Sequence, residues 1–113
     1  MLNIQTSYFS GYRGPNAVGI SGRVPDGFKG ERIIELAPPW RLYNRLRLIP
    51  QEKWIEDFHK IVLNHLDVEK MAKRCNGKVL LCWEGPGKFC HRRIVAKWFE
   101  TELGIIVPEW SIE

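Results

Sequence analysis

The stretch that decides the fold is KVLLCWEGPGKFCHRRIVAKWF, residues 78–99. It begins with a near-continuous apolar run, KVLLCWE, which is typical of a strand buried on both faces in a parallel sheet. Two glycines and a proline interrupt the run and predict a tight turn. A helical apolar pattern follows from about Cys90 to Leu103 and ends at Gly104. A strand, a turn and a helix in this order indicate an α/β domain.

The rest of the chain fits the same architecture. Further strands are expected where apolar residues alternate or run together: at 2–8, at 17–21, and from 105 to a stop at Pro108. Helical segments are expected where apolar residues recur every three to four positions: 40–48, 50–66 and 68–76. Residues 33–36 fit a short strand or the end of a turn. We therefore predict a single small three-layer Rossmann-like α/β domain over residues 1–113, with a mostly parallel sheet.

Composition restricts the class of protein. The 113 residues are 44% hydrophobic and 27% charged, which is typical of a globular domain and argues against a disordered chain. No apolar run approaches the roughly 20 residues that cross a bilayer, and residues 1–9 lack the pattern of a signal peptide. Three cysteines without a framework spacing favour free thiols in a reducing compartment. We expect a cytoplasmic protein with no membrane partner.

The charge balance favours acidic partners. The net charge is +4 and the isoelectric point is about 9.1, which suits phosphate-bearing ligands without establishing nucleic-acid binding. Five tryptophans are many for this length. Each is expected to pack in or near the core, whereas an exposed one would offer a stacking platform for a base.

The turn that follows the apolar strand carries the features of an anion site. In an open α/β sheet, ligands gather beyond the carboxyl ends of the strands, at helix N-termini. Gly85 and Gly87 would let backbone amides approach an anion. Positive charge follows at Lys88, Arg92 and Arg93, although the spacing of a Walker loop is absent. The alternative is that the glycines only connect strand and helix while the basic residues are solvated.

Two arginines from other parts of the chain are expected to reach the same cleft. Arg23 lies in a glycine-rich loop, and Arg41 begins a basic cluster with Arg45 and Arg47. Such clusters are usually solvated, but this one could line the cleft and add phosphate contacts. The predicted ligand-binding residues are Gly85, Gly87, Lys88, Arg92, Arg23 and Arg41.

Three residues around the turn are candidates for chemistry: Cys90, His91 and Glu84. Cys90 is expected in the first helical turn beside basic side chains, where a thiolate is stabilised and becomes nucleophilic; the alternative is an inert packed thiol. At about 100° per residue, His91 faces inward while Arg92 and Arg93 turn away. His91 then either closes the core or forms an acid–base pair with Glu84.

A metal site at this turn has to be considered, because Cys82, Cys90 and His91 are all residue types that bind metals. We nevertheless expect no metal here. Adjacent helical residues diverge by about 100°, and neither C-x-x-C nor H-x₃-H spacing occurs. Cys82 also lies within the apolar run, where a buried structural cysteine is expected. The sequence identifies no other cofactor.

The segment LLCWEGPGKFCHRRIVAKWF resembles the C-terminal signature of the domain-of-unknown-function 488 family. In that family a buried strand ends in Cys-x-Glu, and Cys-His-Arg opens a helix after a short loop; the matching residues here are Cys82, Glu84, Cys90, His91 and Arg92. LAPPWRLY resembles the Leu-Ala-Pro-Ser segment of its short, YeaO-like branch, whereas GRVPDGFKG lacks the tryptophan of that branch's Trp-Pro-Arg-Gly loop. The resemblance implies a compact α/β fold with a pocket at the Cys-His-Arg turn and implies no particular reaction.

We therefore expect a domain that binds a phosphate-bearing small molecule, a nucleotide or a nucleotide-derived metabolite, in a cleft at residues 85–93. Two alternatives stay open. One is an enzyme that uses Cys90 as nucleophile with His91 and Glu84 in support. The other is a nucleic-acid accessory protein that uses the basic residues and an exposed tryptophan. A homodimer that completes its cleft across two subunits is also compatible with the sequence.

Overall fold

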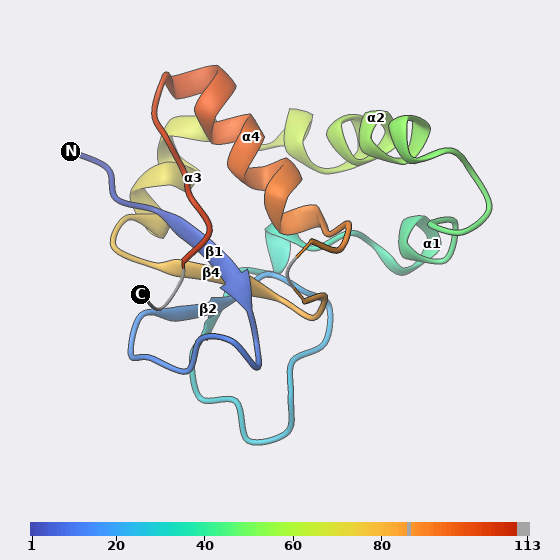
Figure 1. The fold of residues 1–113 in the computed structure, drawn as a ribbon. Coiled ribbons are helices and arrows are strands. Elements are labelled where there is room, and N and C mark those ends of the chain that lie inside the picture. Colours follow the sequence, from blue (N-terminus) through green and yellow to red (C-terminus); the bar gives the residue numbers. More distant parts are fainter. Residues whose placement is uncertain (86, 111–113) are drawn as a thin grey trace.

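The computed structural model describes residues 1–85 and 87–110. Its centre is a four-stranded parallel sheet with the order β1-β4-β2-β3 (Figure 1). The strands are β1 (Gln5–Tyr8), β2 (Ala17–Gly19), β3 (Glu31–Arg32) and β4 (Val79–Cys82). The apolar β4 lies between β1 and β2, with Leu80 opposite Thr6 and Val18, so all of its residues are buried. The prediction of a small Rossmann-like α/β domain is confirmed.

Helices make up most of the remaining regular structure in the described ranges. They are α1 (Trp40–Tyr43), α2 (Gln51–Ile61), α3 (Val68–Cys75) and α4 (His91–Leu103), with 3₁₀ turns η1 (Ile34–Leu36) and η2 (Leu63–His65). The start of α3 is fixed by Asp67, whose carboxylate accepts a hydrogen bond from the Lys70 amide at 3.1 Å. The end of α4 is fixed by Gly104, whose left-handed φ of 66° suits glycine. Within the described residues, no helix has both the length and the apolar character needed to cross a bilayer.

The helix predicted over 50–66 is shorter in the structure. Helix α2 ends at Ile61, and the chain departs from it at Val62 to form η2. Ile61 and Val62 are β-branched and lose side-chain freedom in a helix. The departure from the helix buries Val62 and Leu63 in the core. Of the two alternatives for residues 33–36, the turn is correct, since they contain η1.

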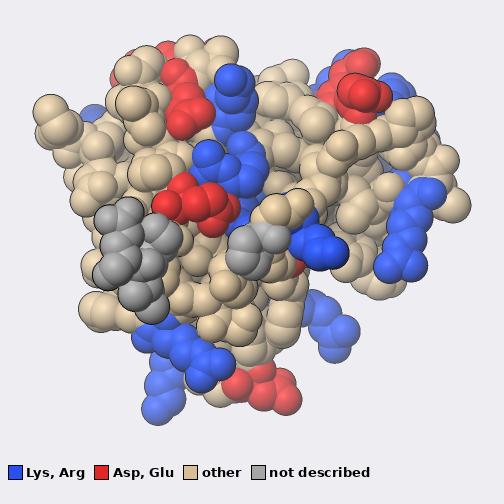
Figure 2. Space-filling model, viewed as in Figure 1, with Lys and Arg blue, Asp and Glu red and all other residues tan. Residues whose placement is uncertain are grey.

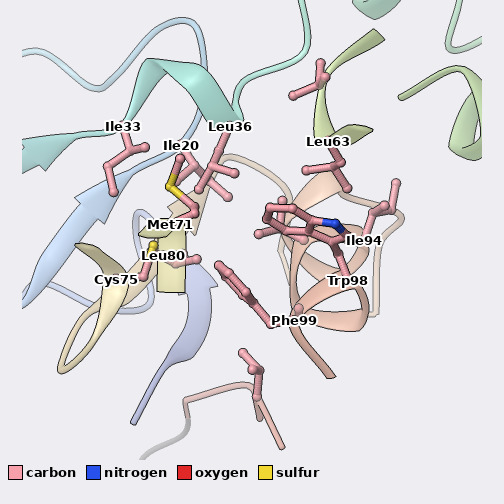
Figure 3. Close-up of a cluster of buried hydrophobic side chains, with 14 of the residues drawn as sticks. Ile20, Ile33, Leu36, Leu63, Met71, Cys75, Leu80, Ile94, Trp98 and Phe99 are labelled. Atoms are coloured by element: carbon pink, nitrogen blue, oxygen red, sulfur yellow. The ribbon is translucent and has the colours of Figure 1, made fainter. Parts of the chain in front are cut away.

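The helices gather on one face of the sheet. Buried side chains such as Leu80 of β4 with Ile94 and Phe99 of α4 fill the space between helices and sheet (Figure 3). The other face carries a smaller cluster around Leu81, which is covered by loop residues: Phe9, Tyr12, Val24 and Phe28. The layers are therefore helices, sheet and loops (Figure 1). Because successive strand residues alternate between faces, Leu80 and Cys82 both point toward α4.

The last strand, predicted from residue 105 and ended by Pro108, is not formed; the described chain instead makes a single bridge at Glu109, after Pro108. Glu109 pairs with Thr6 of β1 in parallel. The Thr6 amide donates to the Pro108 carbonyl at 3.0 Å, and the Trp110 amide donates to the Thr6 carbonyl at 2.7 Å. Pro108 has no N–H to donate, which limits the ladder. The segment therefore lies along the outer edge of β1 and places Glu109 against the start of α4.

Candidate functional site

The turn between β4 and α4 is shaped by glycine and by its own hydrogen bonds. Gly87 has a φ of 75°, in the left-handed region that favours glycine. The Lys88 amide donates to the Gly85 carbonyl at 3.3 Å. Pro86, the other residue of the predicted Gly-Pro-Gly turn, lies outside the described residues. Helix α4 then begins at His91, at the carboxyl-terminal edge of the sheet.

Cys90 is the N-cap residue of α4 and not part of its first turn. Its backbone is extended, with φ −152° and ψ 145°, which corrects the expectation that the helix starts at Cys90. The side chains of Cys90 and His91 therefore do not diverge as those of two adjacent helical residues do. No side chain of the described residues caps the start of α4, so its first amides lack that usual partner.

A hollow of about 670 Å³ lies beside this turn. It is bounded by the end of β1, the turn, the start of α4 and the C-terminal segment, the region where ligands collect in parallel α/β sheets. In the view of Figure 2, basic side chains lie along α4 with an acidic group beside them. Gly87, Lys88 and Arg92 of the predicted binding set line the hollow, and so do residues not predicted: Ser7, Tyr8, Phe89 and Glu109.

Arg92 is buried, which corrects the expectation that it turns into solvent. Only 1% of the residue is exposed. Its Nη1 donates to the Glu84 carbonyl at 2.7 Å and to Cys82 Sγ at 2.9 Å, and its Nε donates to Glu109 Oε1 at 2.7 Å. The guanidinium group therefore ties the turn, the end of β4 and the C-terminal segment to the start of α4.

Arg93 and Lys88 differ in how far their charges are already engaged. Arg93 is half-buried rather than turned away, and its Nη1 donates to Thr6 Oγ1 at 2.8 Å and to the Val107 carbonyl at 2.9 Å. Lys88 is exposed, and none of the ion pairs among the described residues involves it. Lys88 is therefore the cation of the hollow with the most freedom to meet a ligand.

Ser7 is a residue of the hollow that sequence reasoning missed. It is 1% exposed near the end of β1, and its hydroxyl has no hydrogen-bond partner within residues 1–85 and 87–110. The oxygen is buried, and Ser7 lies opposite Leu81 in the sheet, so its side chain points toward the loop face rather than toward α4. The signal that could have found it is the pair Thr6-Ser7, two polar residues at buried positions of an edge strand.

Three residues of the predicted binding set serve elsewhere. The Gly85 carbonyl accepts a weak hydrogen bond from Arg92 Nη2 at 3.4 Å and so supports the turn itself. The Arg23 carbonyl accepts from Trp83 Nε1 at 2.9 Å in the loop layer. Arg41 is exposed on α1. Among the described residues, these three do not line the hollow, because the loop layer covers the face of the sheet opposite α4 and α1 lies away from the turn (Figure 1).

Cys82 and Cys90 form a disulfide, and their Cα atoms are 7.2 Å apart. This corrects the expectation of free thiols at both positions. Cys75 is the free cysteine of the described chain, and burial raises its pKa to about 12. His91 adjoins the pair: its Nδ1 lies 3.8 Å from Cys90 Sγ, and its Nε2 donates to the Ile20 carbonyl at 2.7 Å. Burial lowers the pKa of His91 to about 4, so the ring is neutral at neutral pH.

The predicted catalytic residues are not assembled around the hollow. Cys90 is 5% exposed and its sulfur is bonded to that of Cys82. The His91 ring is hydrogen-bonded to Ile20 instead of Glu84, and Glu84 contributes its backbone carbonyl to Arg92. None of the three lines the hollow in the part of the chain that the structure describes. The arrangement therefore lacks an exposed nucleophile beside a base and an orienting acid.

A second hollow, of about 760 Å³, lies on the loop face of the sheet. Phe9, Phe28 and Trp83 line it with aromatic rings, and Arg13 and Lys29 add charge. The rings of Phe28 and Trp83 both meet Phe9 edge to face. This hollow does not include the start of α4, which lies on the other face of the sheet.

Comparison with protein-family models, with curated proteins and with solved structures finds no match for this chain. The resemblance of residues 80–99 to the domain-of-unknown-function 488 family therefore stays a prediction.

Proposed function

We propose that the chain binds a phosphate-bearing small molecule, a nucleotide or a nucleotide-derived metabolite, in the hollow beside the start of α4. The observation that carries the proposal is the meeting of three cations, Lys88, Arg92 and Arg93, at one hollow beside the carboxyl-terminal edge of the sheet. A phosphate group placed there would accept hydrogen bonds from the exposed Lys88 and the half-buried Arg93. We also propose, separately, that the protein is cytoplasmic.

The start of α4 favours an anion through the backbone. The helix has 13 residues, so its macrodipole places partial positive charge near His91. No side chain of the described residues caps this end. Because Gly87 has no side chain, the turn lets a phosphate approach the backbone closely. These features stabilise a negative charge in addition to the side-chain cations.

The apolar part of the wall favours an organic phosphate over free phosphate. Tyr8, Phe89 and Trp110 contribute aromatic side chains, and such rings bind a flat group such as a nucleobase by stacking. The volume of about 670 Å³ lies within the range of roughly 300–1,000 Å³ that is usual for small-molecule sites. A phosphate ion alone would occupy only a small part of this space.

The three cations have different roles in the proposal. Lys88 makes the direct charge contact, because it is exposed and carries no ion pair among the described residues. Arg93 keeps a side chain that is 40% exposed, so it can add a second contact beyond its bonds to Thr6 and Val107. Arg92 is a positioning residue, since its donors already hold the turn and the C-terminal segment.

Calorimetric titration with ATP, AMP and adenosine tests the proposal. We expect ATP and AMP to bind, and adenosine to bind at least about 10-fold more weakly, because a hydrogen bond to a charged group contributes roughly 1.5–3 kcal/mol. Lys88→Ala should weaken the phosphate compounds by a similar factor. Lys97→Ala is the matched control, since Lys97 is exposed on the same helix away from the hollow. The proposal fails if no phosphate compound binds at millimolar concentration, or if the two variants behave alike.

A specific observation also favours nucleic-acid binding as a second candidate function. Trp40 is 71% exposed and stacks on Tyr43, with ring centroids 5.9 Å apart, and Arg41 and Arg47 are exposed in the same stretch of sequence. Exposed aromatic rings with arginines can stack on bases and contact phosphates. Affinity for single-stranded RNA or DNA that falls steeply with salt and is lost in Trp40→Ala would support it, and absent or salt-insensitive binding would remove it.

A further inference from the structure

We propose that Cys82, Cys90 and His91 bind a divalent metal ion that prefers thiolate ligands, Zn²⁺ being the ion to test first, when both thiols are reduced. The ligand atoms of these residues all lie within 4.8 Å of one another. This reverses the expectation drawn from sequence spacing. That expectation placed Cys90 and His91 in one helical turn, whereas the extended backbone of Cys90 directs its sulfur and the His91 ring toward the same point as Cys82.

The distances suit a shared ion. Zn–S and Zn–N bonds of about 2.3 and 2.0 Å place tetrahedral donor atoms roughly 3.5–3.8 Å apart. His91 Nδ1 and Cys90 Sγ are already 3.8 Å apart. The Cα atoms of Cys82 and Cys90 are 7.2 Å apart, beyond the range of roughly 4.4–6.8 Å that is usual for a disulfide. The backbone therefore leaves room for an ion between the two sulfurs after rotation of their side chains.

The hydrogen bonds around the cluster orient its ligands. His91 Nε2 lies 2.7 Å from the Ile20 carbonyl, an acceptor, so the ring proton is on Nε2 and the lone pair of Nδ1 faces Cys90. Metal-bound histidines usually donate their second nitrogen to a carbonyl or carboxylate in this way. Arg92 Nη1 donates to Cys82 Sγ at 2.9 Å, and a cation that donates to sulfur stabilises the thiolate.

The surroundings favour retention of an ion. Cys82 is fully buried, and Cys90 and His91 are 5% and 7% exposed. The Phe58 ring packs against the His91 ring with centroids 5.8 Å apart, so part of the shell is apolar. The described residues provide three ligands, which leaves the fourth tetrahedral position to a water molecule or a small ligand. Binding releases the proton of each thiol to solvent.

The metal proposal is independent of phosphate binding. None of the three ligands lines the hollow in the described part of the chain. Arg92 separates the cluster from the hollow: its Nη1 donates to Cys82 Sγ, and the residue also lines the hollow. A variant that loses the metal can therefore keep its affinity for ATP, and Lys88→Ala can keep its metal.

Titration of the fully reduced protein with Co²⁺ under anaerobic conditions tests the site. We expect a single Co²⁺ ion per chain, with the intense visible bands of tetrahedral cobalt and a thiolate-to-cobalt charge-transfer band, and displacement by Zn²⁺. Cys90→Ser should weaken Co²⁺ binding by at least about 10- to 100-fold, the loss that removal of an outer-shell partner alone typically causes. Serine is a favoured N-cap residue, so this variant should fold, which circular dichroism verifies.

Cys75→Ala is the matched control, because Cys75 is a buried cysteine that lies outside the cluster; its spectrum with Co²⁺ should match that of the unaltered chain. His91→Gln provides a test that leaves both thiols in place and should remove the tetrahedral spectrum. The proposal is overturned if the reduced chain binds no Co²⁺, if the bound ion shows no charge-transfer band, or if Cys75→Ala weakens binding as much as Cys90→Ser.

Discussion

Replacement of Arg92 by methionine should destabilise the protein by about 2–4 kcal/mol. Methionine keeps an apolar stem of similar length and removes the guanidinium group. The Glu84 carbonyl then loses its donor at 2.7 Å, which costs roughly 1–3 kcal/mol for a partly buried group. The ion pair with Glu109 at 2.7 Å adds only about 1 kcal/mol, because the Glu109 side chain is 38% exposed and water can replace its partner.

Urea denaturation followed by circular dichroism measures this loss as a shift in midpoint. Arg74→Met is the matched control. Arg74 donates to Glu35 at 2.8 Å, but both side chains are more than 40% exposed, so its loss should cost less than about 1 kcal/mol. If Arg92→Met costs no more than Arg74→Met, the guanidinium does not hold the turn and the C-terminal segment together. The role assigned to the buried arginine would then be wrong.

Three further predictions concern stability. The Cys75 thiol stays neutral to about pH 12 in the folded chain but ionises near its ordinary value of 9.0 when unfolded. The free energy of unfolding should therefore keep its full value below pH 9 and fall above pH 9 by at most about 1.4 kcal/mol per pH unit. Urea titrations on either side of pH 9 would measure this decrease, and Cys75→Ala should reduce it. Trp54→Phe removes the Nε1 hydrogen bond to the Leu42 carbonyl at 2.8 Å, so the urea midpoint should fall by the equivalent of about 1–2 kcal/mol; an unchanged midpoint would show that this bond adds no net stability. Gly104→Ala places a side chain at a φ of 66° and should lower the thermal midpoint through a cost of about 1 kcal/mol, whereas an unchanged midpoint would exclude the left-handed cap.

The fold was predictable where local pattern and burial agree. The apolar run at 78–84 contains β4, the central strand of the sheet, and the helical spacing after it corresponds to α4. Asp67 also begins α3, and Gly104 ends α4, as their residue types predict. The end of α2 was not predictable in this way, because the apolar pattern continues past Ile61 while the core draws the chain out of the helix.

The environment of the turn depends on contacts that sequence spacing does not reveal. Helical spacing predicts an exposed Arg92, but the C-terminal segment brings Glu109 to it from 17 positions away. The turn also folds back so that the Glu84 carbonyl faces the guanidinium. Cys90 joins Cys82 because one residue before the helix is extended rather than helical. Each of these outcomes depends on tertiary contacts or on a boundary shift of a single residue.

Titration of the ¹⁵N-labelled chain with ATP, followed by amide chemical shifts, tests the central claim most directly. The phosphate-binding proposal predicts saturable shifts that are largest for Ser7, Tyr8 and residues 87–93, and that diminish in Lys88→Ala. Shifts that are absent at millimolar ATP, or that concentrate around Trp40 and Arg41 on α1 instead, would contradict it.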